Sequence, residues 1–381
     1  MTSNWVKSTL GELSIGGRGY YGIGASAVPY SAELYTYLRI TDINDDGTLN
    51  MSDLKSVSDE KATDYLLKPN DIVFARTGAS TGRNYFYDGT DGEFVFAGFL
   101  IKFSLDPKKV NPRYIKYYCI SKDYRDWVAA FNTGSTRGNI NAQTLASMPI
   151  SLPDRAIQNR IVKVLDAIEE KRKSNAKIND NLEQQVSVLY QSWFEDFELT
   201  NGVCPENWRY QELSAIADIA SGKRPPVKSE VCNQEMPIPI IGAASVMGFT
   251  SEANHTDKIL VTGRVGTHGV IQRFNTPCWT SDNTLVITSS YYEFTNQILH
   301  RIDYSSMNRG STQPLITQGD MKKIVVLVPD EDTLAKFEEF AGSLMAKWET
   351  NTKENVKLAS LRDTLLPRLM SGEIDISNIQ L

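Results

Sequence analysis

The sequence is poor in cysteine, contains no long hydrophobic run and has no recognisable cofactor motif. Its four cysteines (Cys119, Cys204, Cys232 and Cys278) are scattered and form no CxxC pair, so neither a disulfide framework nor a structural zinc site is expected. No apolar stretch approaches the ~20 residues of a membrane span, and the N-terminus lacks the apolar core of a signal peptide. We therefore expect a soluble, cytoplasmic protein without membrane contact.

Catalytic motifs are missing as well. There is no GxxxxGK[ST] phosphate loop and no tetrapeptide of the amino-methyltransferase type, and the one GxG (Gly22–Gly24) lacks a GxGxxG context. The three histidines, His255, His268 and His300, have no metal-ligand spacing. We predict that the chain holds no metal and no cofactor and is not itself an enzyme.

One pattern resembles a nuclease motif, but its carboxylates lie too far apart to form a metal site. Pro153-Asp154 followed by Glu169-Glu170-Lys171 resembles the PD…ExK pattern, in which carboxylates hold Mg²⁺. Both parts lie on one predicted helix, whose rise of 1.5 Å per residue separates Asp154 from Glu169 by about 22 Å. Carboxylates that far apart cannot share a metal ion. We interpret Pro153-Asp154, and the equivalent Pro329-Asp330, as helix starts.

The net charge of −6 is unevenly distributed. Residues 1–150 and 201–328 are balanced, whereas 151–200 carry 7 basic against 9 acidic residues and 329–381 carry 6 against 10. The acidic excess therefore lies in two segments that read as helices. Residues 1–150 and 201–328 can still form local basic surfaces, so the overall charge does not exclude a nucleic-acid partner.

The chain repeats itself at a constant offset of 176 residues. Asn132, Gly134, Ser135 and Thr136 recur as Asn308, Gly310, Ser311 and Thr312, and the register continues through Lys171/Lys347, Asn175/Asn351, Asn179/Asn355, Leu182/Leu358 and Leu189/Leu365. This period is too long for a solenoid, whose units run to ~20–50 residues. It indicates a duplicated domain plus helix, and hence a two-fold pseudo-axis that suits a duplex DNA partner.

The expected fold is mixed α/β. Strand candidates in the first domain are Asp71–Ala75, Phe94–Phe103 and Met148–Leu152, and those in the second are Pro237–Ala243, Ile259–Thr262 and Lys323–Val328. Long helices are predicted from Pro153-Asp154 to about Phe197 and from Pro329-Asp330 to Ser371-Gly372. The predicted boundaries are 1–152 (domain), 153–199 (helix), 200–328 (domain) and 329–381 (helix and tail).

Both predicted helices carry residues at seven-residue intervals that indicate an antiparallel coiled coil. The seam positions are Ile161, Ile168, Asn175, Asn179, Leu182 and Leu189 in the first helix, and Leu344, Asn351, Asn355, Leu358 and Leu365 in the second. The four asparagines are expected to meet in the middle of the seam, where polar groups fix the register at a cost in stability. The alternative is a helix rotation that leaves them in solvent.

Glycine-rich loops with arginine and hydroxyl side chains are the candidate DNA contacts, because these groups suit phosphates and arginine can read guanine. One loop type follows a strand at Arg76–Arg83 and again at Arg264–Gly269, and the other spans 132–139 and 308–313. The candidates are Arg18, Tyr20, Arg76, Thr77, Ser80, Arg83, Ser135, Thr136, Arg137, Lys223, Arg224, Arg264, Thr267, His268, Ser311, Thr312 and Gln313. The competing interpretation is that these are turns retained because the fold is duplicated.

The sequence resembles the specificity (S) subunits of type I restriction–modification systems. Asn4-Trp5 and Asn207-Trp208 are similar to the starts of the two target recognition domains of that family. The run from Leu189 to Phe197 resembles the end of the central conserved region, and the run from Leu366 to Glu373 the end of the distal one. The resemblance covers essentially the whole chain, in the order domain, helix, domain, helix.

The resemblance implies a non-catalytic DNA-recognition subunit. Each domain would read one half of a bipartite double-stranded DNA target, and the helices would set the gap and dock two methyltransferase (M) subunits. Restriction (R) subunits would join them. S-adenosylmethionine, ATP and Mg²⁺ would be used by these partners. Because the two domains differ outside the repeated elements, the target is expected to be asymmetric.

Three alternatives remain open from the sequence. The first is a nuclease or methyltransferase with its own recognition domain, and the second is a protein-interaction scaffold without a DNA role. The third is the S subunit of a system that only methylates.

Overall fold

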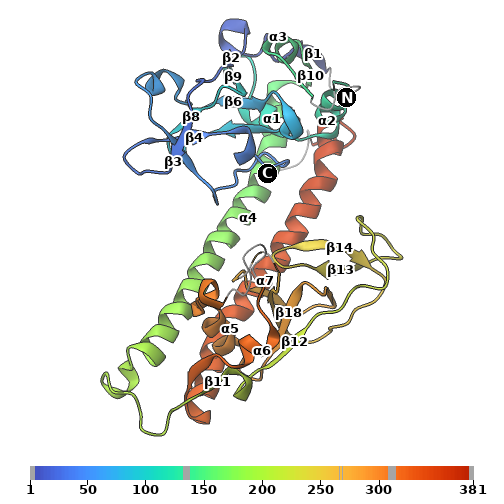
Figure 1. Cartoon of the computed structure of the whole chain (residues 1–381). Coiled ribbons are helices and arrows are strands. Elements are labelled where there is room, and N and C mark those ends of the chain that lie inside the picture. Colours follow the sequence, from blue (N-terminus) through green and yellow to red (C-terminus); the bar gives the residue numbers. More distant parts are fainter. Residues whose placement is uncertain (1–4, 132–137, 266, 268, 308–314, 377–381) are drawn as a thin grey trace. The chain divides into compact units, whose positions relative to one another are not determined.

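The computed structural model describes residues 5–131, 138–265, 267, 269–307 and 315–376. The chain forms two compact units. Unit 1 comprises Met1–Ser174 and Glu354–Leu381, and unit 2 comprises Asn175–Lys353. Each unit therefore contains one domain and a stretch of each long helix (Figure 1). Among the described residues, no helix combines the length and the apolar character that a bilayer crossing requires.

The domain of unit 1 is built on two four-stranded sheets and a strand pair. The pair joins the first and last strands of the domain, β1 (Val6–Thr9) and β10 (Pro149–Leu152), antiparallel. One sheet has the order β2 (Tyr20–Tyr21), β9 (Leu100–Ser104), β6 (Asp71–Ala75), β7 (Asn84–Tyr87), and the other β3 (Ala27–Pro29), β5 (Lys55–Val57), β4 (Tyr35–Leu38), β8 (Phe94–Phe96). The helices are α1 (Pro112–Tyr118), α2 (Lys122–Ala129) and α3 (Ala142–Ala146).

The domain of unit 2 repeats this plan. Its strand pair is β11 (Arg209–Glu212) with β19 (Val325–Val328). Its sheets have the orders β12 (Asp218–Ser221), β18 (Thr284–Thr288), β15 (Ile259–Gly263), β16 (Gln272–Phe274) and β14 (Val246–Thr250), β13 (Ile238–Ile241), β17 (Trp279–Thr280). The smaller sheet pairs β13 with β17 in parallel, as β4 pairs with β8. The helices are α5 (Tyr292–Arg301) and α6 (Gln318–Lys322).

The constant offset predicted from the sequence is confirmed for the elements at the end of each domain. The starts of β10 and β19, at Pro149 and Val325, keep the offset of 176, as do those of α3 and α6, at Ala142 and Gln318. One predicted strand is wrong, because Phe94–Phe103 is divided between β8 and β9. Leu100 N donates to Ala97 O (2.8 Å) in a tight turn, so the two strands enter different sheets.

The long helices α4 (Arg155–Tyr190) and α7 (Glu331–Met370) start where the Pro-Asp pairs predicted. Asp154 accepts a hydrogen bond from Ile157 N (2.9 Å), and Asp330 accepts one from Thr333 N (3.0 Å). Both aspartates therefore cap a helix N-terminus, as the Pro-Asp pairs predicted. The first helix ends earlier than predicted as an α-helix, and a π-helical turn occupies Gln191–Glu195.

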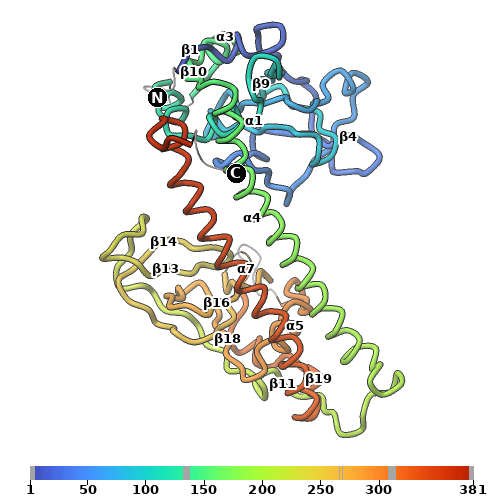
Figure 2. Tube along the Cα trace, turned by 180° about the vertical axis from the view of Figure 1, so that it is seen from behind, coloured from blue at the N-terminus to red at the C-terminus, as the bar shows by residue number. Residues whose placement is uncertain are grey.

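In each unit the stretches of α4 and α7 pack antiparallel, as the heptad pattern predicts (Figure 2). In unit 2, Asn351 Nδ2 donates to Asn179 Oδ1 (2.9 Å), and Asn179 Nδ2 donates to Trp348 O (3.2 Å). In unit 1, Asn355 Nδ2 donates to Arg172 O (3.3 Å), which is the same contact shifted by 176 residues. Ile161, Ile168, Asn175, Asn179, Leu182 and Asn351 are buried, and Leu189, Asn355, Leu344, Leu358 and Leu365 are partly buried. The predicted burial is confirmed for Asn175, Asn179 and Asn351, whereas Asn355 is partly buried.

We expect Asn351→Ala to lower the free energy of unfolding by about 1–3 kcal/mol, because it leaves Asn179 Oδ1 buried without its donor. Changing both Asn179 and Asn351 to leucine should recover most of that loss, since neither polar group of the pair then remains. A double-mutant cycle in urea denaturation measures the coupling energy between Asn179 and Asn351. Asn181→Ala, an exposed change on α4, is the control. Strict additivity of the single changes would contradict the buried pair.

Candidate nucleic-acid interface

Arg76 is held at the end of β6 by backbone contacts on both sides. Its N–H donates to Phe99 O (3.1 Å), and its carbonyl accepts from Ile140 N (2.8 Å). The guanidinium lies over the ring of Tyr21, 5.1 Å from the centroid. Its buried Nε has no hydrogen-bond partner among the described residues. The backbone of the arginine is thus fixed from two sides, and its side chain is only partly buried.

The loop after β6 and the loop at 132–139, which are separate in the sequence, meet in unit 1. Thr77 forms a β-bridge with Asn139. Gly78 N donates to Gly138 O (3.3 Å), and Thr81 Oγ1 donates to the same carbonyl (3.1 Å). The loop after β6 and the end of the 132–139 loop therefore form one surface feature.

Two further candidates lie at the edge strand β2. Arg18 is exposed and stacks on the exposed Tyr20 ring, with its guanidinium 5.1 Å from the centroid. Tyr21 follows directly and accepts a hydrogen bond from Ala142 N (3.2 Å). Because consecutive side chains of a strand leave opposite faces, the Arg18–Tyr20 and Arg76–Tyr21 pairs flank β2 on different sides.

Two predicted contacts are used inside the protein. Ser80 is buried. Arg83 donates to Asp45 Oδ1 (2.7 Å) and to Ile43 O (3.2 Å), so its guanidinium anchors the loop to a neighbouring turn. We therefore leave Ser80 and Arg83 out of the interface. Sequence spacing cannot reveal such a pairing, since Arg83 and Asp45 are far apart in the chain.

Arg264 of unit 2 has the same backbone environment as Arg76. Its N–H donates to Asn283 O (2.8 Å), and its carbonyl accepts from Ile316 N (3.0 Å). The next residue, Val265, forms a β-bridge with Leu315, as Thr77 does with Asn139. The buried Nε of Arg264 also has no partner in the described part of the chain. The two arginines occupy equivalent positions of the two domains.

Lys223 and Arg224 are exposed in the segment after β12. The backbone of this segment is fixed, because Lys223 N donates to Thr280 O (2.9 Å) and Lys223 O accepts from Trp279 Nε1 (2.7 Å). Gly222 allows this approach, since a Cβ there would lie 2.1 Å from Ser281 O. Thr267 is also exposed. Seven of the predicted contacts lie outside the described residues: Ser135, Thr136, Arg137, His268, Ser311, Thr312 and Gln313.

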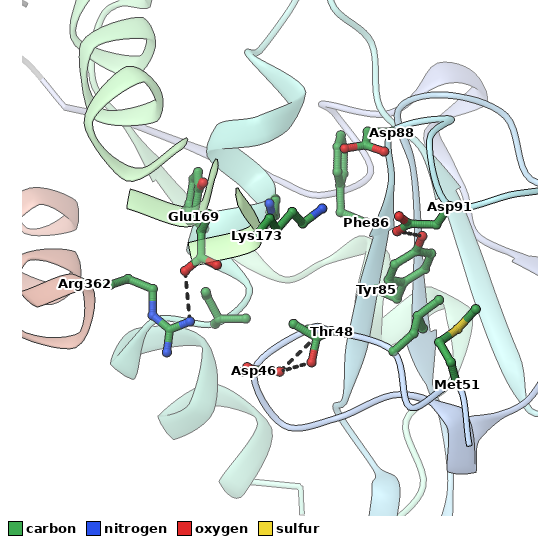
Figure 3. A pocket seen from close by; sticks show the side chains of 15 residues that line it. Asp46, Thr48, Met51, Tyr85, Phe86, Asp88, Asp91, Glu169, Lys173 and Arg362 are labelled. Atoms are coloured by element: carbon green, nitrogen blue, oxygen red, sulfur yellow. Dashed lines mark hydrogen bonds and ion pairs between the residues drawn. The ribbon is translucent and has the colours of Figure 1, made fainter. Parts of the chain in front are cut away.

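Unit 1 also contains a cavity of about 300 Å³ that none of the predicted contacts lines (Figure 3). Arg362 of α7 donates to Glu169 of α4 (3.1 Å) at one side of it, and Tyr85 donates to Asp91 (2.8 Å) at the other. Glu169 and Arg362 are thus paired with each other, and Asp91 accepts from a neutral tyrosine. No sequence motif pointed to this cavity, because its walls come from distant segments of the chain.

The chain matches the family model described as "Type I restriction modification DNA specificity domain" over residues 2–184 and 205–339. It is 20% identical to the type I restriction enzyme HindI specificity subunit of Haemophilus influenzae, over 98% of this chain and 100% of that protein. It is 23% identical to the MjaIX specificity subunit of Methanocaldococcus jannaschii, over 71% of each.

Among solved structures, the type I restriction–modification S subunit from M. genitalium has a similar fold. The TM-score is 0.59 at 20% identity, covering 97% of this chain and 96% of that one. At this identity the likeness supports the architecture of duplicated domains and long helices.

Proposed function

This chain belongs to the type I restriction modification DNA specificity family, and we propose that it binds an asymmetric, bipartite DNA target, one half through the domain of each unit. The observation that carries the proposal is the equivalence of Arg76 and Arg264, two arginines with the same backbone contacts and unsatisfied donors. Arginine is the residue that most often reads guanine in the major groove.

The surroundings of the two arginines support different half-sites. Gly22 and Gly222 occupy equivalent close approaches, with a Cβ meeting Ala97 O at 2.2 Å and Ser281 O at 2.1 Å. The residue before each glycine is Tyr21 in unit 1 but Ser221 in unit 2. Arg76 therefore lies over a ring, whereas the second domain has a small hydroxyl residue there and the basic Lys223-Arg224 beside it. The two domains therefore share a backbone framework around the arginine but differ in the neighbouring side chains, which suits two different base sequences.

We further propose that α4 and α7 set the gap between the half-sites. At a rise of 1.5 Å per residue, a helix of 36 residues is about 54 Å long. That length corresponds to roughly a dozen or more base pairs at 3.4 Å each. The polar seam supports a fixed register between the helices, because the asparagine contacts are made only at one alignment.

The chain is proposed to be non-catalytic and to act through partner subunits. Methyltransferase subunits would supply adenine methylation with S-adenosylmethionine, and restriction subunits would use ATP and Mg²⁺. A system that only methylates would use the same recognition chain, so the presence of a restriction subunit is a separate question. A cytoplasmic location follows from this role.

The proposed docking surface for a methyltransferase subunit is an apolar groove on the helices of unit 2. Its volume is about 740 Å³, and α4 and α7 line it with Val188, Leu189, Phe340 and Leu344. Val188 is 65% exposed and Phe340 56% exposed. Side chains of this size that face water along two packed helices favour a partner helix.

Phe340→Ala is expected to weaken assembly with the methyltransferase subunit about tenfold, because a large aromatic ring is lost from the proposed contact. Sedimentation velocity of the mixed subunits measures the change. Val356→Ala is the control, since Val356 is 68% exposed on α7 within unit 1 and lies outside the groove. Equal loss in both variants would argue against this groove.

The test of the proposed function is a methylation map. The chain is co-expressed with its methyltransferase subunit in a host without DNA methylation, and N6-methyladenine is located by sequencing. We expect a motif of two different halves separated by unspecified bases. A palindromic motif, a continuous motif or no motif at all would refute the proposal. Methylation or cleavage by the purified chain alone would favour the single-chain enzyme instead.

A further inference from the structure

Unit 2 contains a second cleft, of about 860 Å³, which the proposed DNA contacts do not line. One wall is the α4 face with Asp180 and Glu183, and the other is the α5 face with Asn296 and His300. Trp348 of α7 is among the remaining lining residues. The volume falls within the range of ligand sites, which run from about 300 to 1,000 Å³.

Asn296 is the unusual residue of this cleft. It is only 5% exposed, yet its side-chain oxygen has no hydrogen-bond partner in the described part of the chain. Buried polar atoms are nearly always satisfied, so an orphaned acceptor in a cavity wall indicates a missing donor. The terminal amide torsion is soft, and a half-turn about it exchanges the positions of the oxygen and the nitrogen. A ligand N–H or O–H placed in the cleft would supply that donor.

The cleft also carries an unbalanced negative charge. Its two arginines are neutralised, because Arg273 makes a two-pronged ion pair with Glu293 (2.8 and 2.7 Å) and Arg301 pairs with Glu195 (2.6 Å). Asp180 and Glu183 are exposed and form no ion pair among the described residues. Partial burial and then the neighbouring arginines lower the pKa of His300, so its ring is neutral near pH 7. The missing donor is thus expected to be a cation.

The corresponding cleft of unit 1 is chemically different. It is the cavity of Figure 3, which is likewise lined by the first helix after the sheet (α1) and by both long helices. Its volume is about 300 Å³, and its walls include the lysines Lys116 and Lys173 together with Asp46 and Asp91. A ligand selected by two carboxylates would not suit this mixed site. One occupant per chain follows.

We propose that the cleft of unit 2 binds one extended, basic peptide segment of a partner protein. A lysine or arginine of the segment would pair with Asp180 and Glu183, and a backbone N–H would satisfy Asn296. Trp348, over whose ring the Arg273 guanidinium lies 5.8 Å from the centroid, completes the wall of the cleft. The inference rests on the proposed function only in that the chain works within an assembly.

The test uses the full chain and synthetic peptides in isothermal titration calorimetry at low salt. The probe is acetyl-Gly-Arg-Gly-Lys-Gly-amide, and the neutral comparison replaces arginine by citrulline and lysine by glutamine. We expect one site per chain and at least tenfold tighter binding of the basic peptide. Asp180→Asn with Glu183→Gln should abolish that preference. Glu170→Gln, an exposed change on α4 outside the cleft, should leave it intact.

Asn296→Leu separates binding from folding. It removes an unsatisfied acceptor, so the melting temperature should stay level or rise while peptide affinity falls about fivefold or more. Unchanged affinity in this variant would overturn the proposal, as would equal binding of the neutral peptide. Displacement of the peptide by spermine at equal charge concentration would show a small-cation site instead and also overturn it. Because no DNA is present, these results are independent of the methylation map.

Discussion

Alanine in place of Arg76 is expected to weaken binding of the target duplex roughly 5–150-fold, the loss of about 1–3 kcal/mol that a base-reading arginine typically contributes. Arg264→Ala should have an effect of the same size, and the double variant should lose nearly all specific binding. The physical reason is that each guanidinium rests on a backbone fixed from two sides, with its Nε unsatisfied in the described structure. Fluorescence anisotropy with the methyltransferase subunit bound measures the affinities.

The two single variants should also fail in different halves of the target. Arg76→Ala is expected to relax the motif only in the half read by unit 1, and Arg264→Ala only in the other half. The methylation map of each variant reports this directly. A different result would be a loss of affinity that is the same for all DNA sequences, with a slope of affinity against salt concentration that is smaller by about one charge. The arginines would then contact phosphates and not read bases.

Arg83→Ala is the matched control for this prediction. Arg83 closes the same loop as Arg76, but its guanidinium is engaged by Asp45 and Ile43 O. Its removal should change the half-site motif little. A loss as large as that of Arg76→Ala would return Arg83 to the interface and weaken the assignment of roles within the loop.

The elements that the sequence predicted best are those defined by local chemistry. Pro153-Asp154 and Pro329-Asp330 marked both helix starts because an aspartate cap acts within three residues. The heptad pattern predicted the buried asparagines because helical periodicity alone decides which residues share a face. The strand Asp71–Ala75 was identified to the residue, since its apolar run is bounded by turn residues on both sides.

The features that the sequence missed depend on long-range contacts. Nothing local shows that Gly78 lies against Gly138, or that Arg83 pairs with Asp45. The division of Phe94–Phe103 was missed because its apolar residues continue through the turn between two sheets. Asn296 carries no sequence signal either, because an unsatisfied amide is recognised only when all of its neighbours are in place.

The largest effect on stability is expected from Phe337→Ala in α7. Phe337 is 0% exposed, and its ring lies 5.1 Å from that of Phe194 and 6.2 Å from that of Phe294, between centroids. Tyr190 and Trp193 complete an aromatic cluster around it. Removing a buried phenylalanine costs about 3–5 kcal/mol, because the cavity that remains is not refilled. The unfolding transition of unit 2 should fall by on the order of 10 °C.

Phe340→Ala is the matched control for Phe337→Ala. It also removes a phenylalanine side chain from α7, so a difference between the two variants reports the burial of the ring. Phe340 is exposed, and its one ring pair among the described residues is with Trp193, with the centroids 6.0 Å apart. Its replacement should change the free energy of unfolding by less than about 1 kcal/mol, while weakening methyltransferase assembly. Phe337→Ala should do the reverse at temperatures where unit 2 stays folded. Calorimetry measures the melting temperature of each variant, and sedimentation measures its assembly with the methyltransferase subunit. Similar decreases in melting temperature would contradict the assignment of Phe337 to the core and Phe340 to the docking surface.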